Sequence, residues 1–344
     1  MIPLRPPARH FEPWRRALAD AVTDPAELLE LLGLDPALLP AARQAAARFG
    51  LRAPRSFIAR MRRGDPADPL LLQVLPLAAE LVDAPGFDRD PVGDLAALRA
   101  PGVLAKYRGR ALLMTTGACA VNCRYCFRRE FPYESGALTP GRLAAAMSEL
   151  SRTPGLQEVI LSGGDPLALP TARLSRITDA LAELPGLRRL RIHTRTPIVL
   201  PTRVDAPLLD WLRGLPWRPV IVLHANHPRE LSADVRAAIA LLATSGATLL
   251  NQSVLLRGVN DDEDTLAELS VGLFDAGVLP YYLHLLDRVT GTAHFDTAED
   301  EAARLHAGLL RRLPGYLVPK LVREVAGAAS KLPLSATGHP ESGC

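Results

Sequence analysis

The sequence predicts an α/β protein whose core is a parallel sheet in the form of a partial (β/α)6 barrel. From residue 108 onwards, short apolar runs rich in strand-forming residues alternate with amphipathic helical segments, at a spacing of about 30 residues. This order implies right-handed crossovers between parallel strands. Six units are fewer than the eight of a closed barrel, so we expect an incomplete barrel with its mouth at the carboxyl ends of the strands. The expected strands are Ala111–Thr115, Glu158–Leu161, Leu190–Thr194, Val220–His224, Thr248–Leu255 and Tyr281–Leu285.

The segments between these strands have the periodicity of helices that cover a sheet. The segment from Thr171 places apolar residues on one face, namely Leu174, Ile177, Leu181 and Leu184. The segment after Ser232 does the same with Val235, Ile239 and Leu242.

Residues 1–100 are expected to form a helical region punctuated by prolines. Asp24 and Pro25 precede AELLELLGL and supply a cap and a first helical position, while Gly33 ends the helix. Two more short helical patterns follow within residues 55–83. Because this region contains no obvious chemistry, we expect it to pack against and cap residues 101–313, which form the barrel, with residues 314–344 as a C-terminal segment.

Composition excludes several classes of protein. The 40 basic and 37 acidic residues nearly balance, at a net charge of +3, so we expect neither a nucleic-acid partner nor a membrane surface. No signal peptide and no run of about 18 apolar residues is present, which predicts a cytoplasmic protein. Four cysteines, three of them crowded together, do not make a disulfide framework. Cys344 is expected to be a free thiol at the end of the chain.

The chain is organised around the stretch ALLMTTGACAVNCRYCFRREFPY, from Ala111 to Tyr133. Its three thiols, Cys119, Cys123 and Cys126, can converge on one inorganic centre only if the backbone forms a loop around it. A structural zinc ion takes four protein ligands, whereas three thiolates on a four-iron cluster leave one iron open to another ligand. The alternatives are a zinc loop with a distant fourth ligand and three buried core cysteines.

Other candidate residues lie where strands end. Ser162-Gly163-Gly164-Asp165-Pro166 follows the second strand, and its two glycines would let the backbone approach a ligand, although such a turn is also a common strand-to-helix connection. Lys331 follows a run of small residues that would let a flat ring approach its amine, although its residue type alone fits a surface lysine. Polar residues at strand ends suggest a polar ligand, and they are His193, Arg195, His224, His227, Asn251, Gln252 and Asp287.

Seven blocks of sequence, in order, resemble the lysine 2,3-aminomutase family of radical S-adenosylmethionine enzymes. They are CAVNCRYCFRREFPY, SGGDPL, RIHTRTPIVLP, HANHP, LLNQSVLLRGVND, AGVLPYYLHLLD and GYLVPKLVREVAGAASKLPL. The first hundred residues, which include DPAELLELLGL and RSFIARM, look most like the short bacterial branch of that family, associated with elongation factor P.

The resemblance implies three bound groups. Cys119, Cys123 and Cys126 would ligate a [4Fe-4S] cluster whose open iron binds S-adenosyl-L-methionine. Lys331 would bind pyridoxal 5'-phosphate, and Arg128 would pair with the substrate carboxylate. Asp287 and Glu324 would receive the far ammonium of L-lysine. The remaining S-adenosylmethionine contacts would come from Ser162, Gly163, Gly164, Asp165, His224 and Gln252.

The resemblance also implies an isomerase that moves the α-amino group of L-lysine to carbon 3 and forms (R)-β-lysine. In the short branch a separate ligase attaches this product to elongation factor P, and a flavodoxin or ferredoxin would supply the electron. The lysine-degrading members differ from this chain in carrying an aspartate at the position of Glu324 and a C-terminal extension. Two alternatives are an aminomutase of catabolism or antibiotic supply and a non-catalytic metal-binding protein that kept the fold. The sequence leaves homo-oligomerisation open.

Overall fold

The structure, a computed structural model, describes residues 12–133 and 138–334, and their strands form one sheet in the order β1 to β10. Strands β3 to β9 are parallel, whereas β1, β2 and β10 extend the two edges with antiparallel pairs. The strands are β1 (Leu98–Ala100), β2 (Val103–Leu104), β3 (Arg110–Thr116), β4 (Glu158–Gly163), β5 (Arg189–Thr194), β6 (Val220–Leu223), β7 (Thr248–Val254), β8 (Leu279–His284), β9 (Lys320–Arg323) and β10 (Leu332–Pro333).

All six predicted strands are confirmed as β3 to β8. In the described residues the two edge strands, β1 and β10, do not pair with each other, so the expectation of an incomplete barrel is also confirmed. The seventh parallel strand, β9, and the short edge strands were not predicted, because two to four residues are too few for a periodic pattern.

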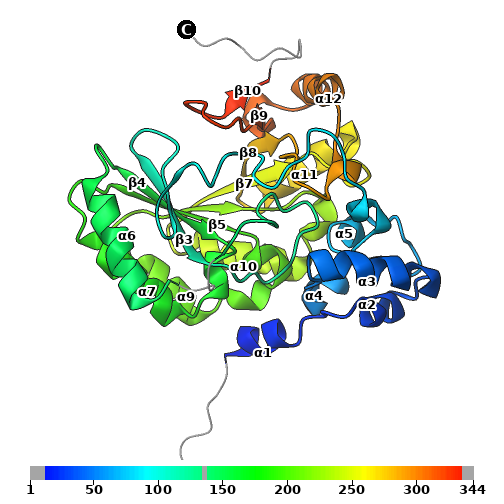
Figure 1. Ribbon diagram of the computed structural model, residues 1–344, viewed down its shortest axis with the longest axis horizontal. Coiled ribbons are helices and arrows are strands. Elements are labelled where there is room, and N and C mark those ends of the chain that lie inside the picture. The colour runs from blue at the N-terminus through cyan, green and yellow to red at the C-terminus, as the bar shows by residue number, and fades with distance from the viewer. Residues whose placement is uncertain (1–11, 134–137, 335–344) are drawn as a thin grey trace, which may run out of the picture.

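Helices cover one face of the sheet (Figure 1). They are α6 (Pro140–Arg152), α7 (Thr171–Ala182), α8 (Thr196–Val199), α9 (Ala206–Arg213), α10 (Ala233–Ala243), α11 (Glu263–Asp275) and α12 (Glu299–Arg312). The predicted apolar faces of α7 and α10 are buried in the main core, except that Leu184 lies just beyond the end of α7.

The N-terminal helices form a separate bundle beside the sheet (Figure 1). They are α1 (Pro13–Ala19), α2 (Pro25–Leu32), α3 (Leu39–Arg48), α4 (Arg55–Ile58) and α5 (Pro69–Leu72). As predicted, Asp24 caps α2, and Gly33 ends it at a φ of 62°. The core of this bundle includes Ala120 and Val121, so the N-terminal region packs directly against the cysteine loop.

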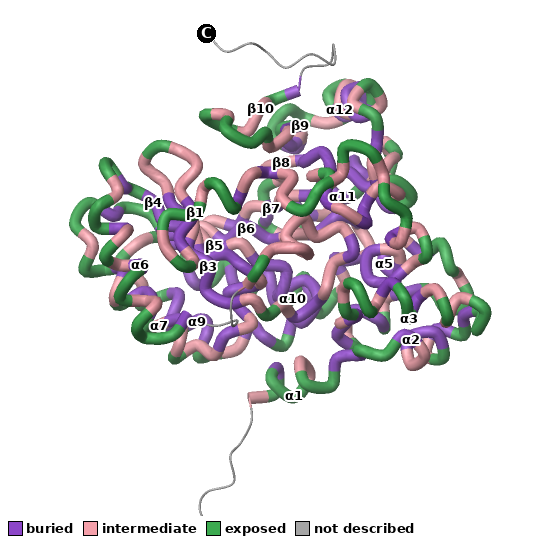
Figure 2. Tube along the Cα trace, in the orientation of Figure 1, coloured by how far each residue is buried: buried purple, intermediate pink, exposed green. Residues whose placement is uncertain are grey.

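The two faces of the sheet have different chemistry. Successive strand residues point to opposite faces, and one set, including Leu113, Leu161 and Ile192, is buried in the core shared with the helices. Figure 2 shows that the trace around β3 and β4 is largely buried. The intervening residues point to the other face, where several of them are polar. The periodicity therefore leaves a polar inner face opposite the helices.

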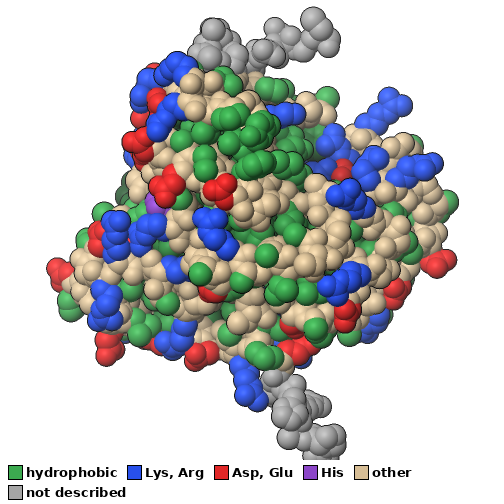
Figure 3. Space-filling view, turned by 180° about the vertical axis from the view of Figure 1, so that it is seen from behind, with side chains coloured by type: hydrophobic (Ala, Val, Ile, Leu, Met, Phe, Trp, Pro, Cys, Tyr) green, Lys and Arg blue, Asp and Glu red, His purple; other side chains and the backbone are tan. Residues whose placement is uncertain are grey.

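No helix in residues 12–133 or 138–334 is long and apolar enough to span a bilayer. On the face shown in Figure 3, acidic and basic side chains are scattered among one another. That distribution agrees with the nearly balanced charge of the sequence.

Candidate active site

The cysteine loop follows β3 and therefore lies at the carboxyl end of the parallel strands. Burial raises the pKa of the Cys126 thiol to about 11, and Cys123 adds to the shift. Burial raises the pKa of Cys119 as well, and the neighbouring Cys126 and Cys123 add to this shift. The three thiols are therefore close enough to influence one another's ionisation. Among the described residues, however, no group of three or more His, Cys, Asp or Glu side chains could hold a single metal ion. A cubane cluster fits this arrangement better, because each of its thiolates binds a different iron.

Buried ion pairs attach the loop to the N-terminal region. Arg124 is fully buried and donates from Nε to Glu80 Oε1 at 2.8 Å. Arg129 donates from Nη2 to Glu80 Oε2 at 2.7 Å, and the backbone N–H of Arg124 donates to the carbonyl of Gln73 at 2.9 Å. The first hundred residues therefore hold the loop in place as well as packing against the barrel.

The glycine turn after β4 packs against the start of the cysteine loop. The Gly164 N–H donates to the carbonyl of Thr116 at 2.7 Å. A Cβ on Gly164 would lie 2.3 Å from the carbonyl oxygen of Ala118, and one on Gly163 would lie 2.5 Å from that of Thr116. The structure thus requires both glycines for contact between two backbone segments, whereas their contact with a ligand stays a prediction.

Asp165 connects the ends of two strands. Its carboxylate accepts hydrogen bonds from the Thr194 hydroxyl at 2.7 Å and from the backbone N–H groups of Arg195 and Thr196 at 2.8 and 2.9 Å. It also caps the short turn that follows, by accepting from the Leu167 N–H at 2.9 Å. Asp165 therefore fixes β4 to β5 beside the cysteine loop, and its carboxylate is already occupied.

A cavity of about 260 Å³ lies on the polar inner face of the sheet. It is lined by the predicted site residues Arg128, Ser162, His224, Gln252, Asp287, Glu324 and Lys331. The segment after the last cysteine and the distant Lys331 thus face the same space. The three cysteines, Gly163, Gly164 and Asp165 do not line the cavity but lie next to it.

Alternating charges run along one side of this cavity. Asp94 pairs with Arg128 Nε and with Lys106 Nζ, each at 2.6 Å. Lys106 also reaches Glu324 Oε1 at 2.9 Å, and the other oxygen of Glu324 accepts a hydrogen bond from Lys331. Burial alone would raise the pKa of Glu324, but Lys331 and Lys106 lower it to about 2. Glu324 is therefore ionised.

Asp287 lacks such partners. Burial, followed by the negative charge of Glu324, raises its pKa to about 7. In the described part of the chain its carboxylate has no hydrogen-bond donor and no ion pair. It is therefore positioned to gain from a cation that enters the cavity.

Three histidines add neutral polar atoms to the cavity. The Nε2 atoms of His193, His224 and His284 are buried and have no hydrogen-bond partner among the described residues. Burial lowers the pKa of all three, that of His224 to about 3, so they are uncharged near neutral pH. Buried polar atoms without partners are typical of a site that a ligand completes.

Sequence reasoning missed several residues of this site and included some that are structural. Asp94, Lys106 and His284 line the cavity, and Asp94 overturns the expectation that the first hundred residues contain no site residue. Of the predicted strand-end residues, His227 caps a turn by accepting from the Arg229 N–H at 3.1 Å, and Asn251 bonds to the backbone of Ala225. Neither lines the cavity.

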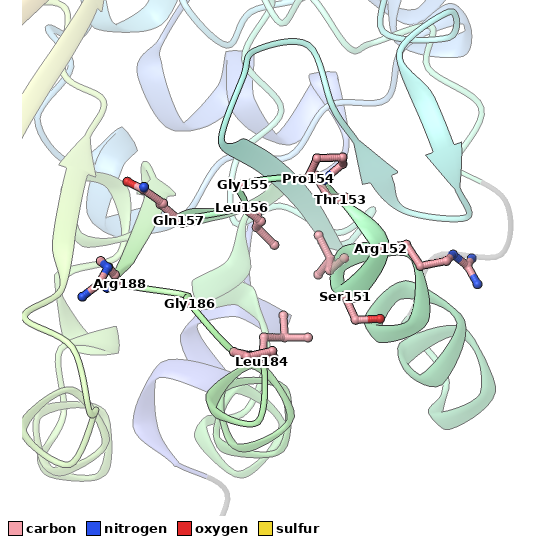
Figure 4. A pocket seen from close by; sticks show the side chains of 12 residues that line it. Ser151, Arg152, Thr153, Pro154, Gly155, Leu156, Gln157, Leu184, Gly186 and Arg188 are labelled. Atoms are coloured by element: carbon pink, nitrogen blue, oxygen red, sulfur yellow. The ribbon is translucent and has the colours of Figure 1, made fainter.

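A second hollow, of about 420 Å³, lies at the opposite, amino ends of the strands. Figure 4 shows that loops before β4 and β5 line it, and that Arg152 and Arg188 extend in different directions. Both arginines are exposed, and the hollow contains no acidic residue or histidine. We therefore place the candidate active site at the other end of the sheet.

Comparison with known proteins agrees with this geometry. Residues 113–269 match the Radical SAM superfamily. The chain is 49% identical over 335 residues to the L-lysine 2,3-aminomutase of Escherichia coli (strain K12), with 97% of each chain aligned. It is 43% identical over 331 residues to that of Haemophilus influenzae, with 96% of this chain and 98% of the relative aligned. A radical SAM methyltransferase from Sphaerobacter thermophilus aligns over 64% of this chain and 68% of its own, at 18% identity and a TM-score of 0.46. The identity to the two aminomutases over nearly the whole chain shows that it belongs to the L-lysine 2,3-aminomutase family of radical S-adenosylmethionine enzymes.

Proposed function

We propose that the protein converts L-lysine to (R)-β-lysine with a [4Fe-4S] cluster, S-adenosylmethionine and pyridoxal 5'-phosphate. The observation that carries the proposal is one cavity lined by Arg128, the acidic pair Asp287 and Glu324, and Lys331. A guanidinium pairs well with a carboxylate, and two carboxylates pair well with an ammonium. Lysine carries a carboxylate at one end and an ammonium at the other. Lys331 supplies an amine beside both.

The cysteine loop supports the cluster and S-adenosylmethionine. Cys119, Cys123 and Cys126 would hold three irons, and the fourth would be open. When bound, the cluster and S-adenosylmethionine supply a carbon radical that removes hydrogen from the substrate. Ser162, His224 and Gln252 line the cavity and would position this cofactor, while the Gly163-Gly164 turn and Asp165 hold the loop beside it.

Two features support pyridoxal phosphate. The Lys331 amine faces the cavity, and the Arg110 guanidinium lines the same cavity without an ion pair in the described residues. Such a cation would pair well with the phosphate group of the cofactor. When bound, pyridoxal phosphate supplies a ring that stabilises an unpaired electron next to the migrating nitrogen.

The acidic side of the cavity supports a substrate with a cationic side chain. Glu324 pairs with Lys331 and Lys106, whereas Asp287 has no ion pair in the described residues. Binding of pyridoxal phosphate would take the Lys331 amine away from Glu324. The side-chain ammonium of lysine would take its place beside Glu324 and Asp287.

We further propose that the product serves elongation factor P through a separate ligase, with a flavodoxin or ferredoxin as electron donor. Support comes from the blocks DPAELLELLGL and RSFIARM in the first hundred residues, which resemble the short branch associated with elongation factor P. The alternative is an aminomutase of catabolism or antibiotic supply. Purified elongation factor P and its ligase, added to the reaction, should incorporate the product; a ligase that ignores the product would favour the alternative.

The central test is anaerobic turnover of the reconstituted enzyme with L-lysine, S-adenosylmethionine, pyridoxal phosphate and dithionite. We expect (R)-β-lysine by chiral analysis. Turnover of glutamate or arginine in place of lysine would reject the proposed substrate. Stoichiometric zinc without iron or sulfide would reject the proposed chemistry and favour a non-catalytic metal-binding protein.

A further inference from the structure

Arg195 provides a buried cation next to one of the three cysteines. It follows β5, and its backbone N–H is held by Asp165. Its side chain is buried, with the whole residue 4% exposed, and its Nη1 donates a hydrogen bond to Cys123 Sγ at 2.9 Å. The contact joins a guanidinium to a sulfur atom that we expect to be a cluster ligand.

The orientation of this guanidinium is fixed from several sides. Its Nη2 donates to Gln73 Oε1 at 2.6 Å and to Glu230 Oε2 at 3.0 Å. The guanidinium carbon lies over the rings of Phe57 and Tyr125, at 5.4 and 5.5 Å from their centroids. Such a guanidinium cannot easily turn away from Cys123, so the bond to sulfur is part of the folded state.

Water is excluded from the surroundings of Arg195, where Gln73, from the N-terminal region, and Glu230 are both fully buried. Glu230 is its ionic partner and offsets part of its positive charge, but only Arg195 donates to Cys123. Charges act more strongly on one another where water is excluded. A positive charge and a hydrogen bond to a thiolate both favour the cluster state that holds one more electron, and therefore raise its reduction potential.

We propose that Arg195 is a positioning residue that sets the reduction potential of the cluster through Cys123, and that Gln73 and Glu230 hold its guanidinium in place. This inference rests on the proposed cluster. The reduction itself transfers one electron from the external donor to the cluster, while Arg195 keeps its protons and its charge. The N-terminal region would thereby influence how readily the cluster accepts an electron.

The test is a redox titration of the reconstituted protein, followed by electron paramagnetic resonance. Replacing Arg195 alone by an apolar residue would leave Glu230 buried without a partner, so the first variant is the charge-balanced double R195M with E230Q. At a fixed potential we expect the ratio of reduced to oxidised cluster to fall about tenfold, which corresponds to about 59 mV for one electron. A potential equal to that of the unaltered protein, at full iron and sulfide content, would overturn the proposal.

A second variant, R195K, keeps the buried charge, so it is expected to fold even if the double variant does not. A lysine ammonium would pair with Glu230 and Gln73 and leave Cys123 without its donor, so the reduced fraction should again fall. The matched control is R203K, because Arg203 is also fully buried but bonds to the carbonyls of Leu167 and Leu169 instead of a cysteine. An equal fall in R195K and R203K would assign the effect to general loss of packing and refute the inference. Absence of iron from the unaltered protein would instead refute the proposed function.

Discussion

Lowering the pH from about 8 to about 6 should weaken the binding of L-lysine about tenfold, because Asp287 would bind a proton in place of the substrate ammonium. With a pKa of about 7, Asp287 is roughly nine-tenths ionised one pH unit above that value and roughly one-tenth ionised one unit below it. If only the ionised form attracts the ammonium, affinity follows the ionised fraction.

The direction of the effect follows from the cause of the shift. Burial and Glu324 raise the pKa of Asp287 above its usual value of 3.8, so the unliganded fold favours the protonated acid. The corresponding contribution to stability is present below the unfolded pKa and is lost as the pH rises through about 7. Lys331 lowers this pKa, so removal of its charge by a bound cofactor would raise the pKa further and strengthen the dependence of affinity on pH.

Competition binding of L-lysine and L-norleucine to the enzyme loaded with pyridoxal phosphate separates Asp287 from other titrating groups. Norleucine has the same α-amino and carboxylate groups but no side-chain ammonium. We expect the preference for lysine over norleucine to fall by about tenfold or more between the two pH values in the native protein, and to be nearly independent of pH in D287N. A preference that stays constant with pH in the native protein would refute the role given to Asp287.

Three further predictions concern the parts that support the site. In G164A, the new Cβ would lie 2.3 Å from the carbonyl oxygen of Ala118 and should force the cysteine loop to move. We expect the free energy of unfolding to fall by about 1–3 kcal/mol and the iron content to fall as well. The control is G141A, whose Cβ would have no atom within 4 Å, and equal iron in both variants would contradict the prediction. E80Q should lower the free energy of unfolding by about 3–5 kcal/mol in denaturant titrations, because it leaves the buried Arg124 and Arg129 without a counter-ion. The control is D210N, in an exposed ion pair, which should change this free energy by less than about 1 kcal/mol. K331A should abolish the absorbance of protein-bound pyridoxal phosphate while K320A, an exposed lysine, keeps it; retained absorbance in K331A would place the cofactor elsewhere.

The sequence predicted the six central strands because their apolar runs are long enough to show a pattern. It also predicted that the cysteine loop lies at their carboxyl ends, because this follows from chain order in any parallel sheet. The resemblance to a family supplied the rest of the predicted site, and Arg128 and Lys331 do line one cavity. Residue type alone would not have selected Lys331.

Sequence reasoning missed residues whose importance depends on distant partners. Nothing near Asp94 in the sequence shows that Arg128 and Lys106 will lie against it. The same holds for Gln73, a polar residue at the end of a short helix that becomes fully buried next to Arg195. Asp165 shows the reverse case, since it occupies a ligand motif but its carboxylate is taken up by the backbone and by Thr194.

The incomplete closure of the barrel explains why charged residues line this cavity. Lys106 follows β2 at one side of the sheet, and Glu324 follows β9 at the other. In a closed barrel these edges would meet through backbone hydrogen bonds and apolar side chains would fill the interior. Here the two sides are joined by the ion pair between Lys106 and Glu324, and the second oxygen of Glu324 contacts Lys331. The gap between the sheet edges is therefore held by side chains whose charges a substrate can rearrange, which backbone pairing would not permit.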